Sequence, residues 1–148
     1  MRFSGKVYKD GKFWLAEIPI LDVITQGHTE KEVFEMVSDM VESMVNKDDF
    51  EVNVYLGEDG NFEIESSEPS HLISLLLQRK RQLNGLSLEQ VANRLGLSSC
   101  NSYARYERGH TMPTLGKLGE LLHAVNPEAD FVISESTAPI KRFTDCRG

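Results

Sequence analysis

Residues 86–109 form the stretch LSLEQVANRLGLSSCNSYARYERG, which contains the start and end signals of two short helices. Ser87 can cap the first helix, and Gly96 supplies the turn that follows it. The second helix is predicted from about Ser99 to Arg108. Ala92, at the centre of the first helix, is small enough to let another helix cross closely. The stretch therefore predicts two short helices joined by a tight turn.

A longer helix is predicted on each side of this pair. The preceding helix is capped by Ser70 and ends at Asn84-Gly85, and the following helix opens at Pro113-Thr114. Both have an apolar side that should face inward. These apolar residues are Leu72, Ile73, Leu76, Leu77 and Leu83 in the first helix, and Leu115, Leu118, Leu121, Leu122 and Val125 in the last.

Two short helices joined by a glycine turn have the geometry of a helix-turn-helix. Over residues 72–125 the sequence resembles the phage-repressor type, or XRE family, of helix-turn-helix proteins. The matching segments are Arg81, LSLEQVA at 86–92, LGLS at 95–98, YERG at 106–109 and MPTL at 112–115. The resemblance implies an all-α domain that binds operator DNA, with an internal ion pair between Arg81 and Glu107.

The second helix of the motif carries the residues that we expect to enter the major groove. Arg105 suits bidentate contact with guanine and Asn101 with adenine, although Arg105 could also be an exposed solubility residue. Tyr103 and Tyr106 lie three residues apart, and core packing is favoured over base stacking for both. The predicted DNA-binding residues are Ser99, Cys100, Asn101, Ser102 and Arg105, with Arg79 and Lys80 as phosphate contacts.

Charge is distributed unevenly along the chain. The formal net charge is −7, but residues 1–70 contain 6 Lys and Arg against 16 Asp and Glu, a difference of −10. Residues 71–148 contain 10 basic and 7 acidic residues, a difference of +3. The change falls at SSEPS, residues 66–70, a stretch typical of a link between domains. We therefore predict a domain at 1–66, a linker at 67–71, a domain at 72–126 and a tail at 127–148.

The acidic half is predicted to follow the order βββαββ, so that the whole chain is of the α+β class. Strands are expected at about residues 3–8, 13–18, 23–26, 50–56 and 62–64, and a helix is expected after Thr29, which forms a capping box with Glu32. Methionines on the inner side of this helix are expected to fill the core. In the tail, Phe131-Val132-Ile133 could form a short strand, and most of the remainder is expected to be flexible.

This order, with AEIPIL at residues 16–21 and TQGHT at 25–29, resembles the HicB antitoxin family over residues 3–65. The resemblance implies a partial ribonuclease-H-like fold and a basic, RNA-cleaving HicA-like toxin as partner. An acidic surface can imitate the phosphates that such a toxin binds, although it can also serve solubility alone. The predicted toxin-binding residues are Glu32, Glu35, Asp39 and Glu42, on one face of the helix.

Neither an enzyme nor a metal or cofactor site is expected. Ribonuclease H chemistry needs several carboxylates that hold two metal ions, and FSGKVY, the first strand, contains none. His28 is expected to be an exposed residue before the helix, and Cys100 and Cys146 are isolated. Without an apolar leader or a membrane span, the sequence predicts a cytoplasmic protein.

The resemblances together predict a type II antitoxin that neutralises a HicA-like toxin and represses its own operon. The alternative is a stand-alone transcriptional regulator whose acidic domain dimerises or senses a ligand. Domains of this size are marginal alone, so a homodimer or higher homo-oligomer that recognises an inverted repeat is expected.

Overall fold

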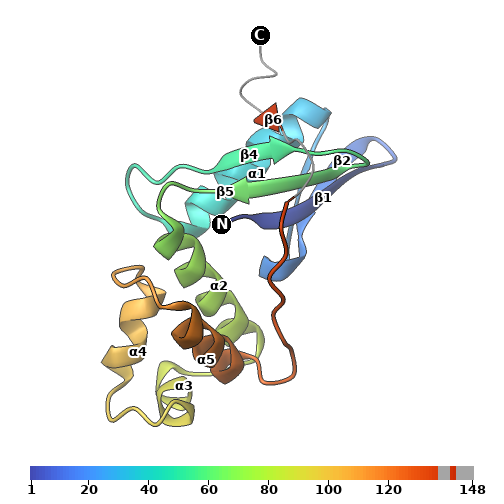
Figure 1. The fold of residues 1–148 in the computed structure, drawn as a ribbon. Helices are drawn as coiled ribbons and strands as arrows, with labels where there is room; N and C mark the ends of the chain where they lie inside the picture. The colour runs from blue at the N-terminus through green and yellow to red at the C-terminus, as the bar shows by residue number, and fades with distance from the viewer. Residues whose placement is uncertain (137–140, 143–148) are drawn as a thin grey trace. The chain divides into compact units, whose positions relative to one another are not determined.

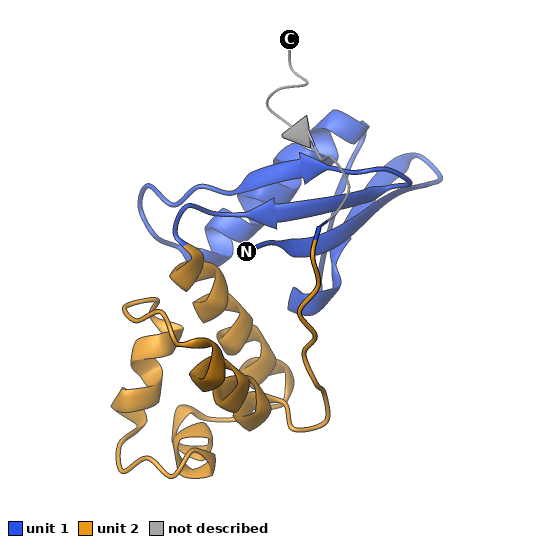
Figure 2. Cartoon of the chain, viewed as in Figure 1, with its two compact units in different colours: residues 1–68, 136–148 blue, residues 69–135 orange. Residues whose placement is uncertain are grey.

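The computed structural model describes residues 1–136 and 141–142, and these residues divide into two compact units (Figure 2). Unit 1 contains residues 1–68 together with Ser136 and the strand at 141–142, whereas unit 2 contains residues 69–135. The rest of the predicted tail lies outside the described residues. Among the residues described, no helix has the length and apolar character needed to cross a membrane.

Unit 1 is a mixed sheet-and-helix unit with the predicted order βββαββ. Its strands are β1 (Phe3–Asp10), β2 (Phe13–Ile18), β3 (Val23–Gly27), β4 (Asn53–Leu56) and β5 (Asn61–Glu65), with the short β6 (Lys141–Arg142) added. They form one antiparallel sheet in the order β3-β2-β1-β5-β4-β6. A one-turn 3-10 helix, η1 (Pro19–Leu21), connects β2 to β3.

Helix α1 (Glu30–Val45) covers one face of this sheet (Figure 1). Thr29 caps the helix as predicted, because its Oγ1 accepts from the Glu32 N–H at 3.0 Å. Glu32 reaches back one residue further than in a capping box, since its Oε2 accepts from the N–H of His28 at 2.7 Å and not from that of Thr29. Phe34 of the helix meets Phe62 of β5 edge to face, with ring centroids 5.5 Å apart. The helix and the inward side of the strands thus form the core of unit 1.

One strand of unit 1 begins later than expected, and one turn residue has an unusual backbone conformation. The strand predicted from Phe50 begins only at Asn53, although Phe50 and Val52 are buried. Glu42 explains the difference locally, because its carboxylate accepts from the Val52 N–H at 2.9 Å and so replaces a strand partner. Asp22, after η1, has φ 51° and ψ 52°, a left-handed conformation that Asp tolerates better than most residues.

Unit 2 consists of four helices: α2 (Pro69–Leu83), α3 (Leu88–Arg94), α4 (Cys100–Glu107) and α5 (Leu115–Val125). All four predicted helices are present, and α4 packs against both α2 and α3. Ser87 caps α3 in a capping box with Gln90, and Thr114 caps α5. The core of this unit contains Leu72, Leu77, Val91, Tyr103 and Leu121.

The sequence placed some residues of unit 2 wrongly. Leu83 and Leu115, which were expected to face inward, are 47% and 69% exposed, because each stands at a helix end beyond the neighbouring helices. The segment around Val132 is not a strand. Helix α2 begins at Pro69, within the predicted linker, because proline is well suited to the first turn of a helix.

Candidate nucleic-acid interface

The outer face of α4 presents a row of polar side chains. Asn101, Ser102 and Arg105 are exposed, and so is Arg108 at the end of the helix, whereas Tyr103 and Ala104 on the opposite side are buried. Residues 101, 105 and 108 are spaced by four and three, so they share one side of the helix. This exposed face, Asn101, Ser102, Arg105 and Arg108, is called the α4 face below.

The start of α4 is built to leave backbone donors near the surface. Ser99 is the N-cap, and its hydroxyl oxygen accepts from the Asn101 N–H at 3.2 Å. A short polar cap of this kind keeps the first turn accessible, and N–H groups at a helix start favour an anion such as phosphate. Ser99 is therefore exposed, as expected, and it also caps its own helix.

A buried polar cluster fixes the other end of α4. The Arg81 guanidinium of α2 contacts the Glu107 carboxylate through both oxygens, with Nε–Oε1 at 2.7 Å and Nη2–Oε2 at 3.0 Å, which confirms the predicted ion pair. The Tyr103 hydroxyl donates to Glu107 Oε1 at 2.7 Å, and Arg81 Nη1 donates to the Leu86 carbonyl at 2.9 Å. One guanidinium thereby connects α2, α4 and the turn before α3.

The pKa values in this cluster are shifted in directions that preserve it. The Glu107 carboxylate raises the pKa of Arg81, and burial, followed by the hydrogen bond to Glu107, raises the pKa of the Tyr103 hydroxyl. Arg81 therefore stays charged and Tyr103 stays neutral over the physiological range. The expected packing role of Tyr103 is confirmed, and Tyr106 is half-buried.

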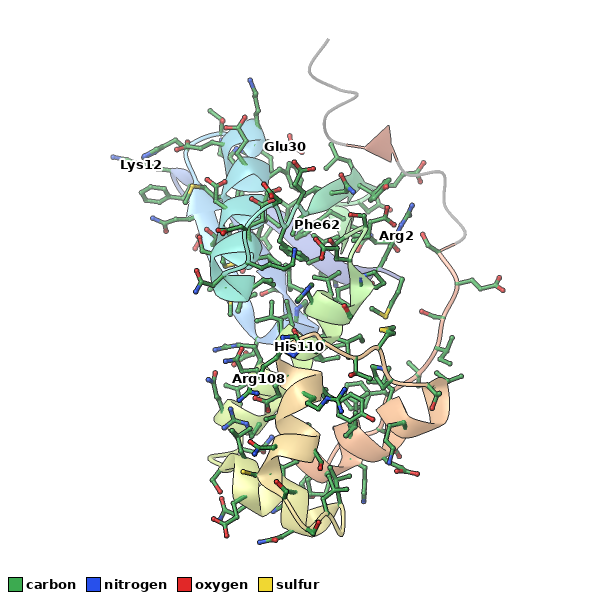
Figure 3. All side chains as sticks on the ribbon, turned by 90° about the vertical axis from the view of Figure 1, so that its left-hand side faces the viewer. Arg2, Lys12, Glu30, Phe62, Arg108 and His110 are labelled. Atoms are coloured by element: carbon green, nitrogen blue, oxygen red, sulfur yellow. The ribbon has the colours of Figure 1, made fainter. Side chains whose placement is uncertain are left out.

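Gly109 ends α4 in a position that no other residue fits. Its φ is 72°, and a Cβ atom there would collide with the imidazole ring of His71. The close approach to His71 and the left-handed backbone both require glycine. On either side of Gly109, Arg108 and His110 are exposed at the C-terminal end of α4 (Figure 3).

The predicted interface residues are not equally accessible. Cys100, which was expected to point outward, is half-buried. Arg79 and Lys80 are half-buried near the end of α2, the helix against which α4 packs. Arg108 was missed, although its position three residues after Arg105 was a signal that could have identified it.

The acidic helix of unit 1 is less open than its sequence suggests. Glu32 and Glu42 accept backbone hydrogen bonds from His28 and Val52, so their carboxylates serve the fold. Glu35 is half-buried, and Asp39 is exposed. Of the four predicted toxin-binding residues, Asp39 is thus the most accessible.

Other candidate sites are weak in the described part of the chain. It contains no cluster of three or more His, Cys, Asp or Glu residues that could hold a metal ion. An open groove of about 460 Å³ lies between α3 and α5, beside Arg94 and His123. Arg94 Nη1 already donates to the Ala124 carbonyl at 3.0 Å, so this arginine helps to join the two helices.

Comparison with known proteins agrees with the geometry of unit 2. A helix-turn-helix family model matches residues 77–128, about a third of the chain. No curated protein matches the chain. The match supports the predicted C-terminal helix-turn-helix and indicates a DNA-binding transcription regulator, with α3 and α4 as the two helices of the motif.

Proposed function

We propose that this protein is the antitoxin of a type II toxin–antitoxin pair, and that it represses its own operon by binding operator DNA through unit 2. The observation that carries the proposal is the α4 face, which stands exposed on the second helix of a helix-turn-helix. The role of unit 1 rests on its charge and on the resemblance to HicB antitoxins.

In the proposed complex, α4 enters the major groove. Arg105 has the donor geometry to contact the O6 and N7 atoms of guanine, and Asn101 can pair with the N6 and N7 atoms of adenine. The first turn of α4, with Ser99, approaches a phosphate, and Lys80 supplies charge near the backbone. The rigid contact of Arg81 with Glu107 supports this arrangement, because a helix that is held at one end loses little freedom on binding.

In unit 1, we propose that the acidic surface binds a basic HicA-like toxin. Residues 1–70 carry a charge difference of −10, which attracts a protein that itself binds RNA phosphates. Exposed Asp39 is the proposed centre of this contact, with the neighbouring acids of α1 adding to the field. On this view the antitoxin covers the surface with which the toxin binds RNA.

A homodimer is part of the proposal, because a single helix-turn-helix contacts only one half-site. Two α4 helices spaced by roughly 34 Å, one turn of DNA, would recognise an inverted repeat. A tightly bound monomer on one asymmetric half-site would contradict this part of the proposal.

The test combines two assays on the full-length protein. In the first, toxin neutralisation is followed by growth rescue and by the rate of association with any small basic protein encoded next to this gene; in the second, operator binding is measured by a DNA mobility shift. We expect D39K to slow toxin association several-fold while operator binding is retained, and R105A to have the opposite pattern. D10K is the matched control, because Asp10 is also an exposed acid of unit 1 but lies in the β1–β2 hairpin.

The two assays also separate the proposal from its alternative. If operator binding depends on Arg105 but no neighbouring protein copurifies or is neutralised, the chain is a stand-alone regulator. If D39K and D10K slow toxin association equally, the toxin responds to the general charge of unit 1 and our placement of the contact on α1 is wrong.

A further inference from the structure

Strand β3 forms one edge of the sheet in unit 1, and nothing in its sequence protects that edge. It follows β2 in the sheet order, and no strand of the described residues pairs with its outer side. It consists of Val23, Ile24, Thr25, Gln26 and Gly27, without a charged residue or a proline. Exposed edges usually carry lysine, proline or a bulge, because unpaired backbone groups recruit further strands.

The register with β2 shows that β3 is a regular strand. Five consecutive pairs, from Val23 with Ile18 to Gly27 with Trp14, run without a bulge. Ile24 is 55% exposed on the sheet face away from α1. At the opposite edge of the sheet, β6 pairs with the last two residues of β4, Tyr55 and Leu56, and places Lys141 and Arg142 at that edge. Of the two edges, the one at β3 is therefore the regular and uncharged one.

The charge pattern indicates what kind of partner fits this edge. Residues 23–29 contain no Asp, Glu, Lys or Arg, although they lie in a half of the chain with a charge difference of −10. A basic partner would be attracted to the acidic surfaces beside this strand and not to the neutral strand itself. A second copy of this acidic unit is repelled by most of its surface, and a neutral edge is where the repulsion is weakest.

We propose that β3 is a self-association edge, at which β3 of a second copy adds in antiparallel orientation across a twofold axis through Thr25. This register is chosen because it pairs all five residues of β3 with all five of the second copy. Thr25 then faces Thr25, Ile24 faces Gln26, and Val23 faces Gly27, whose missing side chain reduces crowding. The two sheets become one continuous sheet.

The pairing does not extend past β3. Asp22 has a left-handed backbone with φ 51° and ψ 52°, and the His28 ring lies 5.2 Å from that of Phe13 in β2, the neighbouring strand. The proposed contact therefore consists of the five residues of β3. The inference concerns unit 1 alone and does not depend on the proposed DNA or toxin binding.

Site-specific cross-linking of the full-length chain tests the register. In a background with C100S and C146S, the variant T25C places two introduced thiols directly opposite each other, within the Cα separation that a disulfide needs. V23C is the matched control, because its two thiols would be displaced by about 13 Å along the strand. Under mild oxidation we expect T25C to form a covalent dimer at least about tenfold faster than V23C. Equal rates would overturn the proposal, even if the protein dimerises through another surface.

Discussion

Arg81 and Glu107 join the first and third helices of unit 2 through two parallel hydrogen bonds of 2.7 and 3.0 Å. Their side chains are only 15% and 8% exposed, so either charge would be left poorly solvated without the other. We predict that E107A lowers the free energy of unfolding by about 3 kcal/mol. Urea denaturation followed by circular dichroism measures this loss. The double variant R81L/E107L should lose less than E107A, and an equal or larger loss would contradict the explanation by an unpaired charge.

Replacing Arg105 should affect sequence recognition more than general DNA affinity. Because its side chain is exposed on α4 and takes no part in the hydrogen bonds described around Glu107, R105A should fold normally. We expect a loss of about 1–3 kcal/mol at the operator and a relaxed preference at one base pair. Binding to the operator and to random DNA is compared by mobility shift. An equal loss on both would mean that Arg105 contacts only phosphate.

Replacing Lys80 should have the complementary effect. Lys80 lies on α2 rather than on the α4 face, so we expect it to contact the DNA backbone. K80A should weaken binding to all sequences alike and reduce the slope of log K against log salt by about 1. Titrations at several salt concentrations measure the slope. A change of sequence preference in K80A would place this lysine near the bases.

Glu65 should make unit 1 sensitive to acid. The hydrogen bond from the Tyr55 hydroxyl, followed by that from Arg2, lowers the pKa of Glu65 below its ordinary value. A carboxyl whose folded pKa is lowered contributes stability above its unfolded pKa, and the contribution is lost as the pH falls through the folded value. E65Q should therefore be less stable than the wild type at neutral pH, and the difference should shrink below about pH 4. Thermal unfolding of both proteins across this pH range checks the trend.

Two glycine-to-alanine changes should shift stability in opposite directions. A Cβ at Gly27 would lie 2.6 Å from the Val33 backbone nitrogen, so G27A forces α1 away from the sheet and should cost about 1–3 kcal/mol. Gly116 lies in α5 with open space around its Cβ position, so G116A should stabilise by about 0.5–1 kcal/mol. Thermal unfolding of each variant gives the sign. A neutral G27A would show that α1 can shift without loss of packing.

Much of the fold could be predicted because local signals and packing agree. Thr29 and Ser87 cap the helices that follow them, as expected, and apolar periodicity identified the strands and helices of both units. The burial predictions are wrong where the apolar periodicity of a helix continues into a turn that is not buried. Leu115 follows the apolar pattern of α5, yet it is the first residue of that helix and its side chain is largely exposed.

The candidate interface was predictable in part for a similar reason. Arg105 and Asn101 follow from the position of α4 after a recognisable turn, and the structure leaves both exposed. The hydrogen bond between Tyr103 and Glu107 lies within α4 at i,i+4 spacing, whereas the way in which both join Arg81 depends on how the buried side of α4 meets α2. The sequence indicated that Glu32 reaches back at the start of α1. The hydrogen bond from the Val52 N–H to the Glu42 carboxylate, by contrast, joins residues ten positions apart in the chain.

The left-handed residues of unit 1 have a consequence for its electric field. Asp22, Asp49 and Asp59, with Asn46, have positive φ at positions where glycine would be the usual choice. Each aspartate brings a negative charge to a turn whose requirement is only geometric. Part of the acidity of unit 1 is therefore a by-product of how its backbone reverses direction. Exchanging the three aspartates for asparagine would make the surface less negative with the turns intact, so long-range attraction can be varied separately from shape.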